Sequence, residues 1–400
     1  MQESQFDHAD ATFAGETRIY LDHAATTPVD EAVVRAMLPY WTSAWGNPSS
    51  LYAAGRTART AIDAARAAVA RVLGCAPNEI IFTGGGTEGD NLALKGSVAA
   101  AQAADRPTHL ITTAIEHHAV LHAADYLERF GTAVTRLPVD AEGFVDPAAL
   151  ETAIRPDTCL ISIMYANNEI GTIQPLTELA AIARRHGIPF HTDAVQAAGS
   201  LPLDVQALGV DLLTIAAHKF YGPKGVGALY VRAGTPLLYQ QQGGPQEGDR
   251  RGGTENVAAI VGLATALTRA EVGRAAYNDH CRALRDRLTD GILAAIPDSQ
   301  LSGPRGDRRL ANNINVAFAG VEGESLIIAL DLAGVAASSG SACTTGATEP
   351  SHVLRAIGVP DAVIAGSLRL TVGRDNTPAD VAELLALLPD IIARLRTDSW

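Results

Sequence analysis

The chain has 400 residues, 47% of them hydrophobic, which is enough to bury a large core and to form about two to three domains. Its formal net charge of −13, with no run of lysine and arginine, argues against direct binding of nucleic acid, which depends on clustered positive charge. No segment approaches the ~18 apolar residues that span a bilayer, and residues 1–17 lack the features of a targeting segment. We therefore expect a cytoplasmic protein with no membrane partner.

The sequence EIIFTGGGTEGDNLALKG, which begins at Glu79, predicts a strand, a glycine turn and an amphipathic helix. Backbone N–H groups at such a helix start bind anions, and Gly86 and the hydroxyl of Thr87 are candidate ligands. The glycines of this turn also satisfy the dinucleotide fingerprint G-x-G-x-x-G, with Glu116 after the next strand as the ribose-binding acid. The motif alone does not decide between a phosphate cofactor, a dinucleotide and a tight turn without a ligand.

A second informative stretch, from His191 to Val231, places an acid and a lysine at the ends of two predicted strands. One strand ends at Asp193 and the next at Lys219. Enzymes that use pyridoxal phosphate need a lysine to bond the cofactor aldehyde and an acid to keep the pyridinium nitrogen protonated. Taken alone, the two residues are more simply a lysine in a turn and an acid that caps a helix.

Strands alternate with helices from Glu79 to Val231, which predicts a largely parallel sheet with helices on both faces. A long helix from about Val257, with a kink or break, then leads into a second α/β layer. We expect residues 30–274 to form a large domain. Residues 1–29 and 275–400 would form a smaller domain.

The cysteines form no CxxC pair and no cluster with histidine, which argues against a disulfide framework or a metal site. Cys75, Cys159 and Cys281 have apolar or helical neighbours, so we interpret them as buried or incidental. Cys343 differs, because it lies among small polar residues in SSGSACTTGATEPS, a predicted surface loop between a strand and a helix. This setting favours a reactive thiol.

Together with YLDHAATTP at Tyr20, these motifs resemble those of the cysteine desulfurases of the NifS/IscS kind, from Ile19 to Arg396. These are fold type I enzymes of the class V aminotransferase family. The resemblance implies an α/β fold, with a large domain built on a mostly parallel, seven-stranded sheet flanked by helices, and a smaller α/β domain. It also implies pyridoxal 5′-phosphate as cofactor, and conversion of L-cysteine to L-alanine.

The resemblance implies catalytic roles for three residues. Lys219 would bond the cofactor, Cys343 would accept the sulfur as a persulfide, and His117 would stack on the pyridine ring. Arg369 would clamp the substrate carboxylate, a role that suits a bidentate guanidinium, although it could instead form a surface salt bridge. Asn167, the first asparagine of NNEIG, would lie near the cofactor oxygen and the substrate carboxylate, or simply belong to a turn.

The same resemblance supplies the other cofactor contacts. Asp193 would pair with the ring nitrogen, Gln196 would meet the ring hydroxyl, and His218 would lie by the phosphate and aldehyde. Gly86 and Thr87 would bind the phosphate at the helix start.

Thr254 would reach the cofactor phosphate of a second copy, which implies a homodimer, although a solvated linker fits its composition equally well. Relatives often carry a serine phosphate ligand where this chain has Ala216, a loss of one hydrogen bond worth about 0.5–1.5 kcal/mol. The implied partner is a sulfur-acceptor protein of iron–sulfur cluster assembly or another thiolation system. Docking to a cluster scaffold is left open, because the chain stops at Trp400, soon after the last predicted helix.

Other activities fit parts of the sequence. A selenocysteine lyase, or another pyridoxal phosphate lyase or aminotransferase, would use the same fold. From different classes, a dinucleotide-dependent oxidoreductase and a sulfur carrier without turnover are the alternatives.

Overall fold

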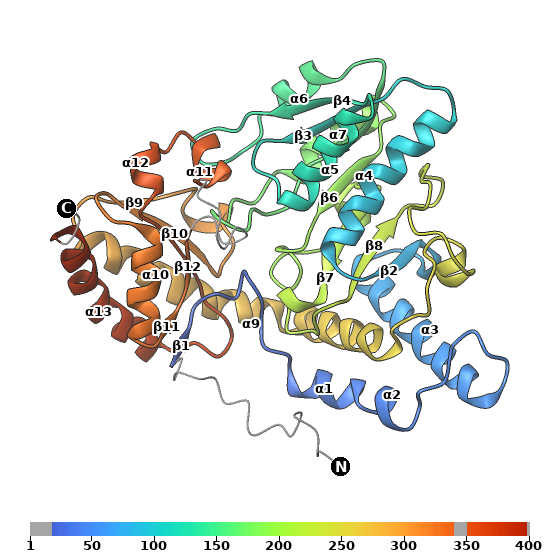
Figure 1. Cartoon of the computed structure of the whole chain (residues 1–400), viewed down its shortest axis with the longest axis horizontal. Coiled ribbons are helices and arrows are strands. Elements are labelled where there is room, and N and C mark those ends of the chain that lie inside the picture. The colour runs from blue at the N-terminus through green and yellow to red at the C-terminus, as the bar shows by residue number, and fades with distance from the viewer. Residues whose placement is uncertain (1–17, 340–349, 398–400) are drawn as a thin grey trace, which may run out of the picture.

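The structure is a computed structural model that describes residues 18–339 and 350–397 (Figure 1). The N-terminal tail and Cys343 therefore lie outside the described residues. Two α/β units lie side by side, and one long helix runs from the first into the second (Figure 1).

The larger unit is built on a seven-stranded sheet with the order β2-β8-β7-β6-β5-β3-β4. Strand β8 runs in the opposite direction to all the other strands of this sheet. The predicted mostly parallel, seven-stranded sheet is therefore confirmed. The central strands are buried along their whole length, as is typical of parallel sheets with helices on both faces. The strands are β2 (Ile80–Thr83), β3 (His109–Thr113), β4 (Ala133–Leu137), β5 (Thr158–Ser162), β6 (Phe190–Asp193), β7 (Leu212–Ala216) and β8 (Gly227–Val231).

Helices cover both faces of this sheet (Figure 1). Successive residues of a strand point to opposite faces, so Ile81 of β2 packs with α4 and α5, whereas Ile80 and Phe82 pack with α3, α7 and the long helix. Gly74 ends α3 at a φ of 67°, a left-handed conformation that glycine adopts readily. The helices are α1 (Glu31–Met37), α2 (Pro39–Thr42), α3 (Ala53–Leu73), α4 (Gly86–Ala103), α5 (His118–Arg129), α6 (Pro147–Ala153), α7 (Leu176–Arg185) and α8 (Val205–Leu208).

The long helix α9 (Val257–Ala295) runs through 39 residues without interruption, so the predicted kink or break is wrong. It contains no proline, and two of its glycines serve close packing instead of bending. A Cβ on Gly262 would lie 2.6 Å from Sδ of Met37, and a Cβ on Gly291 would lie 2.6 Å from Cδ1 of Leu385. The first half of α9 therefore packs in the core of the large unit and the second half in the core of the small unit.

The smaller unit contains a four-stranded antiparallel sheet with the order β12-β13-β10-β9. A separate parallel pair joins β1 to β11, which ties this early strand to the smaller unit. The predicted domain boundary at residue 274 lies inside α9 and stays a prediction. The elements are β1 (Ile19–Tyr20), β9 (Ser299–Leu301), β10 (Asn313–Phe318), α10 (Gly323–Leu332), β11 (Val335–Ala336), β12 (Ser338–Ser339), α11 (His352–Ala356), α12 (Asp361–Ile364), β13 (Ser367–Thr371) and α13 (Pro378–Thr397).

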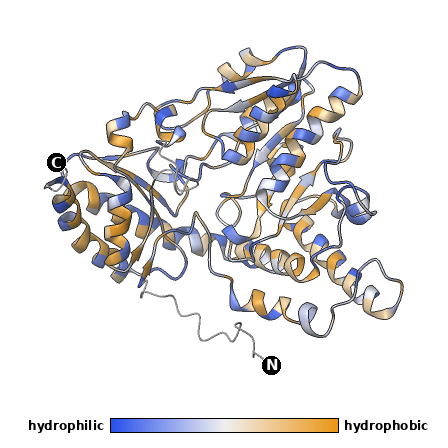
Figure 2. Ribbon diagram, viewed as in Figure 1, coloured by the Kyte–Doolittle hydropathy of each residue, from blue (hydrophilic) through white to orange (hydrophobic). Residues whose placement is uncertain are grey.

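Hydrophobic residues follow the strands and the inward faces of the helices in both units (Figure 2). Across residues 18–339 and 350–397, no helix has the length and apolar composition needed to cross a membrane. Cys159 and Cys281 are buried and Cys75 is half-buried, in agreement with the interpretation of these thiols as buried or incidental.

A small apolar cluster joins the two units at the carboxyl ends of the large sheet. Ile115, Met164 and Ile170 from the large unit pack against Val353 and Leu354 of α11. This contact fixes α11, which begins shortly after the segment that carries Cys343, beside the edge where the predicted site residues lie.

Candidate active site

Lys219 and Asp193 lie at the same edge of the large sheet. Strands β6 and β7 are parallel neighbours, Asp193 ends β6, and Lys219 ends the short 3₁₀ helix that follows β7. The Lys219 Nζ donates hydrogen bonds to the carbonyl oxygens of Ala24 and Ala25 at 2.5 and 2.7 Å. Gln196 Nε2 also donates to the oxygen of Ala24, at 3.0 Å. The segment after β1 therefore holds two of the predicted cofactor residues in place.

Asp193 is a buried acid whose surroundings favour a cationic partner. Its Oδ1 accepts a hydrogen bond from the N–H of Val195 at 2.8 Å. Burial raises the pKa of Asp193 to about 6, while the Val195 N–H and the positive charge of Lys219 act in the opposite direction. A protonated pyridinium nitrogen would stabilise this carboxylate as an anion, so the residue fits the cofactor ring.

His117 and His218 are held as neutral rings. His117 is the N-cap of α5, and its Nδ1 accepts the N–H of Ala119 at 3.1 Å, which leaves the ring proton on Nε2. Burial lowers the pKa of His117 to about 4, and the charge of Lys219 contributes. His218 lies 3.2 Å from the hydroxyl of Thr26, and burial lowers its pKa to about 4 as well. An uncharged His117 ring offers the flat face that stacking on a pyridine ring requires.

The start of α4 provides an anion cradle of the predicted kind. No side chain caps this 18-residue helix, whose N-cap Gly85 has a φ of 152°. A Cβ on Gly86 would lie 2.8 Å from Cγ2 of Val195, so glycine is needed where the helix start approaches the loop after Asp193. Thr87 is exposed beside it. These open N–H groups and the helix dipole fit a phosphate.

Ala216, the predicted departure from the family, lies against this cradle. Its Cβ is 3.6 Å from the point that a Cβ on Gly86 would occupy, and a methyl group supplies no hydrogen bond. The alanine therefore removes one hydrogen-bonding group for a phosphate, while the N–H groups at the start of α4 still fit this ligand.

Arg369 is a buried residue of β13 with 2% of its surface exposed, so the surface salt-bridge interpretation is wrong. Its Nη2 donates to Oδ1 of Asp22 at 2.8 Å and its Nη1 donates to the carbonyl oxygen of Asn168 at 3.3 Å. Its Nε is buried and has no hydrogen-bond partner within the described ranges. The guanidinium thus keeps a donor for a further acceptor, and its contact with a substrate carboxylate stays a prediction.

Asn167 is fully buried in the turn after β5. Its Oδ1 accepts the N–H groups of Glu169 and Ile170, both at 2.9 Å, and its Nδ2 donates to the oxygen of Ile115 at 2.8 Å. These bonds fix the turn against the end of β3. A contact with the cofactor or substrate stays a prediction.

Thr254 is exposed in the segment that leads into α9. Nearby Arg251 donates through Nε to Oε1 of Glu88 at 2.8 Å, which ties this segment to the first turn of α4 and thus to the anion cradle. The predicted contact of Thr254 with a partner subunit stays a prediction.

The residues that flank the segment containing Cys343 both lie at the junction of the two units. On one side, Ser338 pairs with Arg369 in the sheet and donates to Oδ2 of Asp22 at 2.7 Å. On the other side, Ser351 Oγ donates to Oε2 of Glu169 at 2.5 Å. The sequence analysis missed Asp22 and Glu169, although both stand inside motifs that it used, because only the fold brings them to these partners.

Asp90 is another acid that the sequence analysis missed. It is buried on α4, and its Oδ1 has no hydrogen-bond partner in the described structure, although His191 Nε2 lies 3.6 Å away. Burial raises the pKa of Asp90 well above its usual range, and the charge of Asp193 adds to the effect. Burial therefore favours the protonated, neutral form of Asp90 beside the carboxylate of Asp193.

Comparison with known proteins agrees with this geometry. The model of the family "Aminotransferase class-V" matches residues 19–384. The cysteine desulfurase IscS of Methanosarcina thermophila is 53% identical over 383 residues, which cover 95% of this chain and 93% of that protein. The chain belongs to the cysteine desulfurases of the class-V aminotransferase family. The resemblance that the sequence motifs indicated is thus confirmed, and the enzymes of this family use pyridoxal phosphate.

Solved structures agree with this assignment to the desulfurase family. A NifS-like protein superposes with a TM-score of 0.88 at 37% identity, covering 94% of this chain and 100% of that one. A structure described as SspA in complex with cysteine superposes with a TM-score of 0.77 at 36% identity, covering 90% of this chain and all of that one. The fold type I architecture is therefore confirmed.

Glu116 does not have the role that a dinucleotide site would give it. The residue is fully buried, and its Oε1 accepts the hydroxyl of Thr113 at 2.7 Å and the N–H of Met164 at 3.0 Å. Burial raises the pKa of Glu116 to about 8, partly offset by these hydrogen bonds. An acid enclosed in this way cannot reach a ribose, which fits the membership of the desulfurase family.

The buried Glu116 should make the apoprotein less stable at high pH. The pKa of Glu116 is about 8 in the folded state, above its usual 4.5. The stabilisation that the protonated side chain gives to the folded state is therefore fully present below pH 4.5 and is lost as the pH rises through 8. We expect Glu116→Gln to remove this loss, so that the variant gains several kcal/mol over wild type between pH 5 and 9. Thermal unfolding of both proteins across this range measures the difference. The exposed Glu178→Gln is the control, and parallel wild-type and Glu116→Gln curves would contradict the expectation.

Proposed function

We propose that the chain is a pyridoxal phosphate-dependent cysteine desulfurase that converts L-cysteine to L-alanine and takes the sulfur on Cys343. The observation that carries this proposal is the convergence of Lys219, Asp193 and the open start of α4 at one edge of the sheet. The ring of His117 and the amide of Gln196 complete a set of donors suited to this cofactor.

Several residues at this edge of the large sheet would each bind a different part of the cofactor. When bound, pyridoxal phosphate supplies an electron sink that stabilises negative charge at the substrate Cα. The N–H groups at Gly86 and Thr87 would bind the phosphate, and the Asp193 carboxylate would keep the ring nitrogen protonated. The neutral face of His117 would pack on the ring, and Lys219 would bond the aldehyde.

Two nucleophilic groups would act in sequence on the substrate. The amine of Lys219 would remove the Cα proton, and the thiolate of Cys343 would then attack the substrate sulfur. A sulfur–sulfur bond forms as the bond between Cβ and sulfur breaks, and the electron pair of the broken bond stays with Cβ until a proton arrives. The balance is one L-cysteine and one thiol giving one L-alanine and one Cys343 persulfide.

The experiment that tests the proposal is an assay of the purified protein with pyridoxal phosphate, L-cysteine and a thiol reductant. A desulfurase releases alanine and sulfide in equal amounts over many turnovers. A sulfur carrier gives no turnover, and a selenocysteine lyase releases alanine from selenocysteine while cysteine remains intact.

Arg369→Ala should raise the KM for cysteine by at least about tenfold while cofactor content stays near that of wild type, because a charged hydrogen bond is worth roughly 1.5–3 kcal/mol. Steady-state kinetics measure this change. Asp22→Ala is the matched control, since it removes the same ion pair and leaves the guanidinium available. An unchanged KM in Arg369→Ala would move the carboxylate clamp elsewhere.

We also propose that the protein is a homodimer that acts in the cytoplasm and passes sulfur to an acceptor protein. Large apolar side chains are exposed around α1 and α2, among them Leu38, Trp41 and Trp45, whose exposure in one chain is 51%, 58% and 73%. Sedimentation of the purified protein distinguishes one chain from two.

A further inference from the structure

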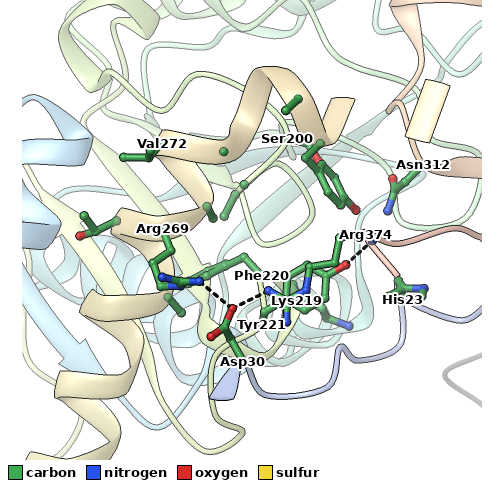
Figure 3. A pocket seen from close by; sticks show the side chains of 18 of the residues that line it. His23, Asp30, Ser200, Lys219, Phe220, Tyr221, Arg269, Val272, Asn312 and Arg374 are labelled. Carbon is green, nitrogen blue, oxygen red and sulfur yellow. Dashed lines mark hydrogen bonds and ion pairs between the residues drawn. The ribbon is translucent and has the colours of Figure 1, made fainter. Parts of the chain in front are cut away.

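A cavity of about 570 Å³ lies between α9, the turn after β7 and the small unit (Figure 3). Its volume is in the range of ~300–1,000 Å³ that is typical of small-molecule sites. Lys219 and Gln196 reach its lining, whereas Asp193, His117 and Arg369 do not. The cavity therefore adjoins the proposed cofactor site and shares Lys219 and Gln196 with it, while its other lining residues lie outside that site.

The lining of the cavity has more basic than acidic side chains. Arg374 Nη1 and Arg269 Nη2 both donate to the same oxygen, Oδ2 of Asp30, at 2.6 and 3.3 Å (Figure 3). Arg374 also lies 3.5 Å from Asp375, which is outside the lining. Among the described residues of the lining, Lys219 is the only other one with a charged side chain. With the amine of Lys219 bonded to the cofactor, Arg269 and Arg374 would still be two bases that face one acid of the lining, in a chain whose net charge is −13. Each guanidinium has five N–H donors, so the shared oxygen leaves donors for another acceptor.

The remaining walls are largely apolar. Phe220 and Tyr221 form one side, where the guanidinium of Arg374 lies 4.1 Å from the centre of the Tyr221 ring. Ala276 and Val272 of α9 lie at the exposed rim. His280 also belongs to the lining, and its Nε2 is buried with no hydrogen-bond partner among the described residues. An apolar wall with a few converging polar groups is typical of a ligand site.

We propose that this cavity binds a small molecule that joins an apolar body to one anionic group, such as a carboxylate or a sulfonate. The anion would accept hydrogen bonds from Arg269 and Arg374, because carboxylates and similar oxyanions match the fork of a guanidinium. The apolar body would lie against Phe220 and the alanines of α9. This ligand would contact the large unit, α9 and the small unit at once, and the site does not depend on the proposed activity.

The test uses the holoenzyme and the fluorescent probe 8-anilinonaphthalene-1-sulfonate, which has an apolar body and one sulfonate. We expect one saturable site in calorimetry and fluorescence titrations. N-phenyl-1-naphthylamine, which has the same body without the sulfonate, should bind at least about tenfold more weakly.

Two pairs of variants locate the site. Arg269→Gln should weaken probe binding by at least about tenfold, whereas Arg287→Gln, at an exposed position of α9 outside the lining, should leave it unchanged. Ala276→Phe should block the cavity, whereas Ala275→Phe, exposed beside it and outside the lining, should not. The absence of saturable binding would overturn the proposal. Binding that survives both Arg269→Gln and Ala276→Phe would overturn it equally.

Discussion

Lys219→Ala is expected to abolish both alanine formation from L-cysteine and the absorbance of bound cofactor. Lys95 and Lys224 are the only other lysines in the sequence. Lys95 lies on α4 with its Nζ 4.3 Å from the centre of the Tyr126 ring, and Lys224 is exposed in the turn before β8. Neither can replace an amine that lies beside Asp193.

The measurement is a spectrum of the purified variant followed by an assay for alanine. Lys224→Ala is the matched control, because it removes a nearby lysine and should retain colour and turnover. Reduction with borohydride fixes the cofactor onto the lysine that holds it. Label recovered on another lysine of the Lys219→Ala variant, together with alanine release, would show that the assignment of Lys219 is wrong.

Cys343→Ser is expected to keep the colour of bound cofactor and to make negligible alanine. An alcohol is almost entirely protonated at neutral pH, whereas a thiol with a pKa of ~8.5 is a few per cent thiolate. The other thiols offer no substitute, because burial raises the pKa of Cys75 and of Cys281 to about 12 and also raises the pKa of Cys159.

Alanine assays and spectra of the Cys343→Ser variant test whether cofactor binding is independent of sulfur transfer to Cys343. Cys75→Ser is the control, since it changes the most accessible of the described thiols and should retain full activity. Near-normal alanine production by Cys343→Ser would assign the sulfur-accepting step to another group.

Much of the fold could be predicted from local patterns. The runs that become β3, β5, β6 and β7 indicated parallel strands, and the acid that ends β6 and the lysine that follows β7 meet at their shared edge. The glycine turn before α4 indicated the anion cradle, and the structure adds the reason for Gly86, which is the close approach of Val195.

Contacts between distant parts of the chain could not be predicted in this way. Arg369 and its partner Asp22 are 347 positions apart, and Ser351 and Glu169 are 182 positions apart. No local pattern specifies such pairs, because the fold of the whole chain brings them together. The break expected in the long helix was wrong for a related reason, since glycines that look like weak points are required there by partners elsewhere in the sequence.

The most direct test of the account is mass spectrometry of the wild-type holoenzyme after brief exposure to L-cysteine without reductant. If Cys343 accepts the sulfur, the peptide that contains Cys343 gains one sulfur atom, and one alanine is released for each sulfur gained. Extra sulfur on Cys75, Cys159 or Cys281, or alanine released without any persulfide, would contradict it.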